Sequence, residues 1–221
     1  MVRSKGILRE IWGAIFVATL LVRQLTASWL AWSLNWDIRS GGLSQRLLKP
    51  VHPLWQYGVQ MVLAMPIRMA VLLPIVVPIL LWKPDLWRFP SALELGAFCL
   101  SVALAWFITF LVQALIAIAA FWIDKSDALM ALWFAIWGVC SGYTAPMIML
   151  GSPANAVLRW LPFRATLGTP VESLAGPPHE AAETQHILLD LGLQMGWAGV
   201  LFVAVLLAWR RGVARYGAFG A

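Results

Sequence analysis

Long apolar runs, separated by short polar stretches, dominate the pattern of residues along the chain. A helix needs about 20 mostly apolar residues to cross the roughly 30 Å hydrocarbon core of a bilayer. Runs of about that length or longer lie at 11–34, 59–82, 92–122, 128–150 and 187–209. The pattern therefore predicts an all-α integral membrane protein, with about five transmembrane helices bundled into a single domain over residues 1–221.

Three of the runs depart from an ordinary spanning helix. The first is the weakest, because Arg23, Gln24 and Thr26 interrupt it. The third, 92–122, is longer than a bilayer requires, so its helix must tilt or project beyond the membrane. The second contains prolines that would break a soluble helix but are tolerated in membranes, where they predict kinks: Pro66, Pro74 and Pro78.

A short segment between the first and second runs has the pattern of an amphipathic helix. A polar stretch at 35–42 precedes it, and its three leucines fall on one face of a helix over 43–49. Pro50 and Pro53 end that helix. Because it is too short to span a bilayer, it lies at the membrane surface or docks into a groove on a partner.

The longest connection, 151–185, follows the fourth run and is rich in proline. No strand pattern appears in it. We interpret it as an external loop of short interfacial helices, in which residues 156–161 are half apolar.

Composition supports the membrane interpretation and argues against one class of partner. The chain is 61% hydrophobic and only 12% charged, whereas soluble domains carry about a quarter charged residues. The formal charge of +6 is spread over loops and helix ends, which argues against nucleic acid and for contacts with lipid headgroups. Many tryptophans lie near the ends of the runs, as in the aromatic belts of membrane interfaces.

Basic residues in the short loops define the orientation of the bundle only in part. Seven Lys and Arg residues lie on the side of the short helix and the C-terminus, and seven lie on the other side when three at the N-terminus are included. The side of the N-terminus therefore stays open. Arg210, Arg211 and Arg215, directly after the last run, favour a cytoplasmic C-terminus and a cytoplasmic short helix.

The sequence lacks the residue sets of an enzyme or an ATPase. No Gly-x-x-x-x-Gly-Lys-Ser/Thr motif occurs, so the chain has no phosphate cradle for ATP, and no cofactor of its own is expected. The three histidines form no ligand set with cysteine or acidic residues, and no Ser/His/Asp set or carboxylate pair has catalytic spacing. We therefore expect no catalytic residue and no metal site.

Polar side chains inside the apolar runs are costly, and they mark candidate positions of a transport pathway. The candidate pathway residues are Gln113, Arg68 and Gln194. Arg23 is a further polar residue inside an apolar run. Two alternatives compete with a pathway role. Arg68 can extend its charge toward the end of its helix, and Gln113 can form an interhelical hydrogen bond.

Several segments resemble a known group of permeases. The sequence Asp-Ile-Arg-Ser-Gly-Gly-Leu-Ser at 37–44, followed by Leu-Leu-Lys-Pro-Val-His-Pro-Leu at 47–54, resembles the cytoplasmic segment of ABC-2 type transporter permeases. Further pieces resemble the subfamily in which two permeases pair with a separate ATPase: Phe121-Trp122, Ser141-Gly142 with Pro146, Leu161-Pro162-Phe163 with Pro170-Val171-Glu172, and the ending from Trp209 to Tyr216 with Gly217 and Gly220. The resemblance covers roughly residues 22–221.

This resemblance implies a membrane-spanning permease subunit of an ABC exporter in the bacterial plasma (inner) membrane. The implied partners are two copies of a cytosolic ABC ATPase, which hold ATP and Mg, and a second permease or a copy of this chain. The short helix is then the coupling helix that contacts the ATPase, through Asp37, Arg39, Leu43, Arg46, Leu47, Leu48 and Lys49. Such permeases usually have six helices, so the resemblance implies that the first is missing here.

Two other classes of protein stay open from the residues alone. A structural or assembly membrane protein needs no ATPase partner. An intramembrane enzyme needs a paired catalytic set, which the sequence does not offer. Nothing in a tryptophan-rich helical bundle indicates which substrate is transported.

Overall fold

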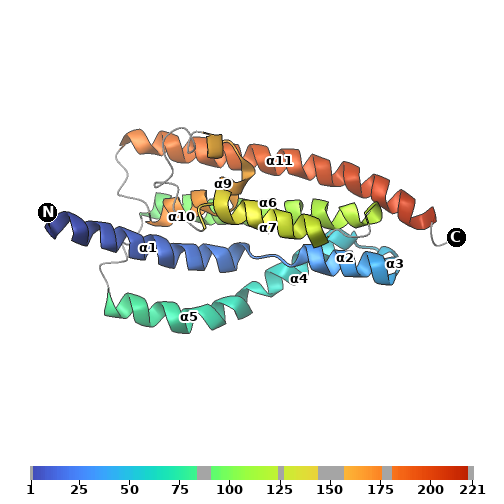
Figure 1. The fold of residues 1–221 in the computed structure, drawn as a ribbon, viewed down its shortest axis with the longest axis horizontal. Helices are drawn as coiled ribbons and strands as arrows, with labels where there is room; N and C mark the ends of the chain where they lie inside the picture. Colours follow the sequence, from blue (N-terminus) through green and yellow to red (C-terminus); the bar gives the residue numbers. More distant parts are fainter. Residues whose placement is uncertain (1, 84–90, 124–126, 144–156, 176–180, 219–221) are drawn as a thin grey trace.

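The computed structural model describes residues 2–83, 91–123, 127–143, 157–175 and 181–218. Within these ranges every regular element is helical, which confirms the all-α prediction. The elements are α1 Val2–Thr26, α2 Leu30–Ser40, α3 Gly42–Leu47, α4 Pro53–Leu63, α5 Met65–Trp82, α6 Ala92–Ile118, η2 Ala119–Phe121, α7 Asp127–Cys140, α9 Pro162–Thr166, α10 Gly168–Ala175 and α11 Ala181–Ala218 (Figure 1).

Four stretches of helix are long and apolar enough to cross a membrane. They are Trp12–Ser40, Pro53–Trp82, Ala92–Phe121 and Leu188–Tyr216, and the shorter apolar helix Ala128–Cys140 adds a fifth candidate. The predicted fourth run, 128–150, extends past residue 143 and so lies partly outside the described residues. A membrane bundle of four to five apolar helices is therefore confirmed.

The α6 helix is the central element of the bundle (Figure 1). Its start is set by a capping box, in which Ser91 Oγ accepts from the Glu94 N–H at 3.3 Å and the Ser91 N–H donates to Glu94 Oε2 at 2.7 Å. It packs against α11, α2, α10 and α1. Half of its most apolar window is buried inside the protein, more than in any other candidate span, so the predicted long third run is the core helix.

The first run falls in one candidate span, Trp12–Ser40, but the expectation of one continuous helix over 11–34 is corrected here. It ends as α1 at Thr26, and a new helix, α2, begins at Leu30. Local side chains compete for the backbone at this point: Thr26 Oγ1 donates to the Val22 carbonyl at 2.9 Å, and Ser28 Oγ accepts from the Leu30 N–H at 3.3 Å. We call residues 27–29 the α1–α2 break.

The polar stretch 35–42 is also more regular than expected. Residues 35–40 continue α2 as helix, and the chain turns at Gly41, which has φ +79°. This left-handed conformation favours glycine, because it has no Cβ to clash with the backbone. The predicted short helix follows as α3, one residue earlier than expected and ending at Leu47.

The second run bends where its first proline stands. The helix α4 ends at Leu63, and α5 begins at Met65 with Pro66 in its first turn, so the two helices follow different directions (Figure 1). Pro74 and Pro78 lie inside α5 without ending it. Proline fits a first helical turn because the missing N–H would have no partner there in any case.

The predicted external connection forms two short helices, α9 and α10, in its described part. The two helices were expected at the membrane interface, but part of this segment is buried inside the bundle. Leu167, between them, is 1% exposed and Val171 of α10 is 5% exposed, and both pack against Ala18 and Val22 of α1. This packing inserts α10 between α1 and α6.

Charged side chains lie near both ends of α11 and leave an apolar stretch between them. Near one end, Asp190 of α11 pairs with Arg159 at 3.1 Å and lies 3.8 Å from Arg164. Near the other end, α11 reaches Arg210. The stretch 191–209 has no charged residue and as a helix spans about 28 Å, close to the thickness of a hydrocarbon core.

Candidate functional site

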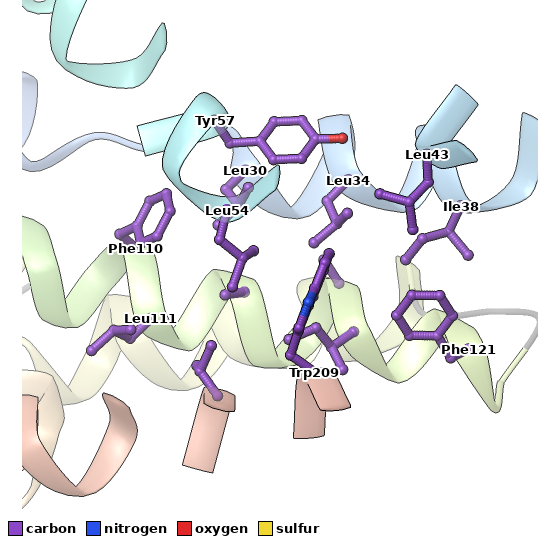
Figure 2. Close-up of a cluster of buried hydrophobic side chains, with 14 residues drawn as sticks. Leu30, Leu34, Ile38, Leu43, Leu54, Tyr57, Phe110, Leu111, Phe121 and Trp209 are labelled. Carbon is purple, nitrogen blue, oxygen red and sulfur yellow. The ribbon is translucent and has the colours of Figure 1, made fainter. Parts of the chain in front are cut away.

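The α2–α3–α4 unit is seated on the charged end of the bundle by the largest apolar cluster. Figure 2 shows side chains of this unit meeting those of α6, η2 and α11. Leu43 of α3 is fully buried in this cluster, beside Ile38 and Phe121 (Figure 2). Burial of each such side chain stabilises the unit by roughly 1.5–3 kcal/mol, so α3 is attached to the bundle as a fixed element.

A polar brace joins the three helices of this unit. The carboxylate of Asp37 accepts a hydrogen bond from Arg46 Nε at 2.7 Å and another from the Tyr57 hydroxyl. The Arg46 guanidinium also lies over the Tyr57 ring, 4.2 Å from its centroid. Gln56 Nε2 donates to the carbonyls of Arg46 and Val51, at 3.3 and 2.8 Å. These charge-assisted contacts fix α3 relative to α2 and α4.

Beyond the brace, the chain presents an exposed apolar tip. Leu48 is 86% exposed, Val51 44% and Leu47 36%. The basic residues Arg46 and Lys49 are neighbours in the same segment, so this surface lies at the charged end, where water and not lipid is expected. We call Leu47, Leu48 and Val51 the apolar tip.

The seven predicted coupling residues therefore divide into three groups. Leu43 faces the core, so the expectation that it shares a free apolar face with Leu47 and Leu48 is corrected. Asp37 and Arg46 form the brace. Leu47, Leu48 and Lys49 are exposed, and Arg39 lines an open cavity of about 520 Å³ on the outer face of α2.

His52 lies between the tip and α4. Its Nδ1 accepts from the Leu54 N–H at 3.3 Å, and its ring lies 5.2 Å from that of Trp209. Partial burial lowers the pKa of His52. Among the residues that the structure describes, no group of three or more His, Cys, Asp or Glu side chains is placed to hold a metal ion.

Two of the three candidate pathway residues serve the α1–α2 break. Arg68 Nη1 donates to the carbonyls of Gln24, at 3.3 Å, and Ala27, and its Nη2 donates to the Met61 carbonyl at 3.0 Å. Gln113, which is 2% exposed, donates from Nε2 to the Ser28 carbonyl at 2.8 Å.

The Gln113 Oε1 completes the arrangement by accepting from the Ala31 N–H at 3.3 Å. Backbone groups in hydrocarbon must find partners inside the protein, and a helix that breaks there leaves several without one. Arg68 and Gln113 supply those partners. The interhelical hydrogen bond foreseen as an alternative for Gln113 is the contact observed. Arg68 binds the Ala27 carbonyl in the break, the Gln24 carbonyl near the end of α1 and the Met61 carbonyl of α4, instead of extending its charge to the end of its own helix.

Gln194 is fully buried near the opposite end of the bundle. Its Nε2 donates to the carbonyls of Ala165 and Ser101, at 2.8 and 3.3 Å, so it ties α9 to α6. Its Oε1 is buried without a hydrogen-bond partner in the described part of the chain. The structure therefore separates Gln194 from the other two candidates.

Sequence reasoning missed Tyr57, Gln56 and Val51. Tyr57 is fully buried although its hydroxyl bonds a carboxylate twenty positions earlier. A buried tyrosine usually finds a hydrogen-bond partner, so its place one turn after Pro53 was a usable signal. Val51 carried no signal, because a single valine between prolines fits a loop equally well.

The fold and this end of the bundle define a multi-pass membrane protein whose water-facing tip is braced to its spanning helices. The sequence matches the family described as ABC-2 family transporter protein over residues 9–220, and the chain belongs to that family. Members of this family typically lack an ATPase domain of their own, so a partner ATPase is implied. No curated protein and no solved structure matches the chain.

Proposed function

We propose that this chain is the permease subunit of an ABC exporter of the bacterial inner membrane, and that its apolar tip docks on a cytosolic ATPase subunit. The single observation that carries the proposal is Leu48, 86% exposed at the charged end of the bundle. A large exposed leucine is ordinary on a lipid-facing helix, but a cluster of apolar side chains in water indicates an interaction surface.

The brace gives this docking a mechanical consequence. A push on Leu48 reaches α2 through the Asp37–Arg46 pair and reaches α4 through Tyr57. The α2 helix begins at Leu30, directly after the α1–α2 break. Because the two helices are not continuous, α2 can tilt independently of α1. Closure of two ATPase subunits around ATP and Mg then shifts the spans between inward-open and outward-open arrangements.

Two ATPase copies need two tips, and one chain of this kind presents one. The functional unit in this proposal is therefore a pair, formed with a second permease or with a copy of this chain. Lys49, exposed beside the tip, supplies a basic rim residue that favours an acidic cleft on the ATPase.

The test is a paired aspartate substitution, Leu47→Asp with Leu48→Asp, in the chain expressed together with its ATPase. A charge placed at the centre of an apolar contact should lower co-purification of the ATPase at least tenfold, because buried apolar anchors are worth about 2 kcal/mol or more each. Membrane insertion should not change, since both side chains lie outside the spans.

The control is Gln45→Asp, on the same short helix and exposed, which adds one negative charge outside the apolar tip, where the double variant adds two within it. It should retain most of the bound ATPase. Equal recovery of the ATPase with wild type and with the double variant would overturn the docking proposal.

A further inference from the structure

Arg23 is a cation inside the candidate membrane span Trp12–Ser40. It lies one turn before the α1–α2 break. Its side chain is exposed, and in the described part of the chain it has no carboxylate within ion-pair distance. A charged side chain in hydrocarbon is costly without a counter-ion, so Arg23 marks a candidate binding position.

The guanidinium is held in place, but its charge is not neutralised. It lies over the Tyr143 ring, 4.5 Å from the centroid, and donates to the Tyr143 hydroxyl. Tyr143 in turn stacks on Trp137 at 5.5 Å, and Trp137 Nε1 donates to Thr166 Oγ1 at 2.8 Å. This chain of contacts orients Arg23 from α7 and α9 and leaves its remaining N–H groups for an anionic group.

An aromatic strip continues from this cation along α2 and α7. Trp29 and Trp32 are 57% and 42% exposed with ring centroids 5.1 Å apart, and Trp32 stacks on Phe134 of α7 at 5.7 Å. The Trp32–Phe134 contact lies nine residues from the Arg23–Tyr143 contact on both sides: Trp32 follows Arg23 across the α1–α2 break, and Phe134 precedes Tyr143, which lies just past the end of α7.

Open space adjoins the strip. Trp32 and Trp36 border the open cavity of about 520 Å³ on α2, whose other lining residues, Asn35, Arg39 and Ser40, are polar. A Cβ at Gly138 of α7, between Phe134 and Tyr143, would meet no atom within 4 Å.

We infer that Arg23 and this aromatic strip bind an anionic amphiphile, with its phosphate or carboxylate on Arg23 and its apolar chain along Trp29, Trp32 and Phe134. One charge beside a long aromatic surface matches a molecule with one anionic head and an apolar tail. That the bound molecule is a transported substrate rests on the proposed function, whereas the binding site itself does not.

The experiment measures binding of two matched probes to the purified chain in dodecyl maltoside by native mass spectrometry. Dioleoyl phosphatidic acid and dioleoylglycerol share their apolar chains and differ in the phosphate. Arg23→Gln should weaken phosphatidic acid binding about tenfold, because it removes charge-assisted hydrogen bonds, and should leave dioleoylglycerol binding unchanged.

Two further variants separate the head from the tail of the ligand. Arg23→Lys keeps the charge without the planar fork and should lose less affinity than Arg23→Gln. Trp32→Ala should weaken both probes alike. Arg215→Gln, an exposed arginine at the charged end, is the matched control and should bind both probes as wild type does.

A second arm identifies the source of the amphiphile in the ATPase complex trapped with vanadate. A change of phosphatidic acid affinity on trapping assigns the site to a transported molecule, and unchanged affinity assigns it to a resident membrane lipid; both results support the site. Phosphatidic acid binding by Arg23→Gln equal to wild type, with both proteins monodisperse, would overturn it. Failure of ATPase docking leaves this binding measurement unaffected.

Discussion

Replacing Arg68 with methionine should lower the melting temperature of the detergent-solubilised protein by about 10 °C, the largest stability loss that we expect from a single change. Methionine keeps much of the side-chain volume but donates no hydrogen bond. The carbonyls of Gln24, Ala27 and Met61 then lose their partner. Each unpaired buried group costs about 1–3 kcal/mol, and about 4 kcal/mol in total corresponds to that shift for a chain of this length.

Two controls make the Arg68 result specific to the α1–α2 break. Arg68→Lys keeps a donor group and should melt between Arg68→Met and wild type. Arg215→Met removes an exposed arginine at the charged end and should melt within about 2 °C of wild type. A melting temperature for Arg68→Met as high as that of Arg215→Met would show that the break does not depend on this side chain.

The second large effect is expected for Gln113→Leu. This change leaves the Ser28 carbonyl and the Ala31 N–H unpaired in a buried position, which should cost about 2–4 kcal/mol. The melting temperature should fall by about 8 °C. Because Arg68 serves the same break, the loss in the double variant should differ from the sum of the two single losses.

Gln113→Leu also separates the two roles considered for this residue. A structural role lowers stability and leaves the ATPase response of the folded complex near its wild-type level. A pathway role leaves stability near its wild-type level and lowers the ATPase response. An unchanged melting temperature, together with loss of substrate-stimulated ATPase activity, would contradict the structural role assigned here.

The periodicity of the sequence predicted those parts of the fold that depend on local pattern. The long helical stretch Ala92–Phe121 agrees with the apolar run predicted at 92–122. The short helix after Gly41 follows from the leucine spacing and the prolines behind it. Both features depend on consecutive residues. They can be predicted from the length and spacing of apolar positions, without knowledge of tertiary contacts.

The α1–α2 break could not be predicted, because its cause lies elsewhere in the chain. Arg23, Gln24 and Thr26 weaken the run locally, but an isolated segment could still continue as helix. Arg68 and Gln113, about 40 and 85 positions from the break, satisfy the freed backbone groups only after the bundle has formed. Distant partners of this kind leave no trace in local periodicity.

Tertiary contacts also decide which residues of the α2–α3 segment are exposed. All three leucines of the short helix fall on one face by spacing, yet Leu43 is buried and Leu48 is exposed, because the chain leaves the helix at Leu47. The pairing of Asp37 with Arg46 depends on the turn at Gly41, which brings α3 back against α2. The resemblance to ABC-2 permeases had implied that both charged residues contact the ATPase.

The most direct test of the central claim is the accessibility of a single cysteine at Leu48. With Cys99 and Cys140, both free thiols, replaced by serine, Leu48→Cys should react with a membrane-impermeant maleimide in inside-out vesicles only. Addition of the partner ATPase should then protect it. Labelling in right-side-out vesicles, or labelling in inside-out vesicles that the ATPase does not reduce, would contradict a cytosolic tip that docks on an ATPase.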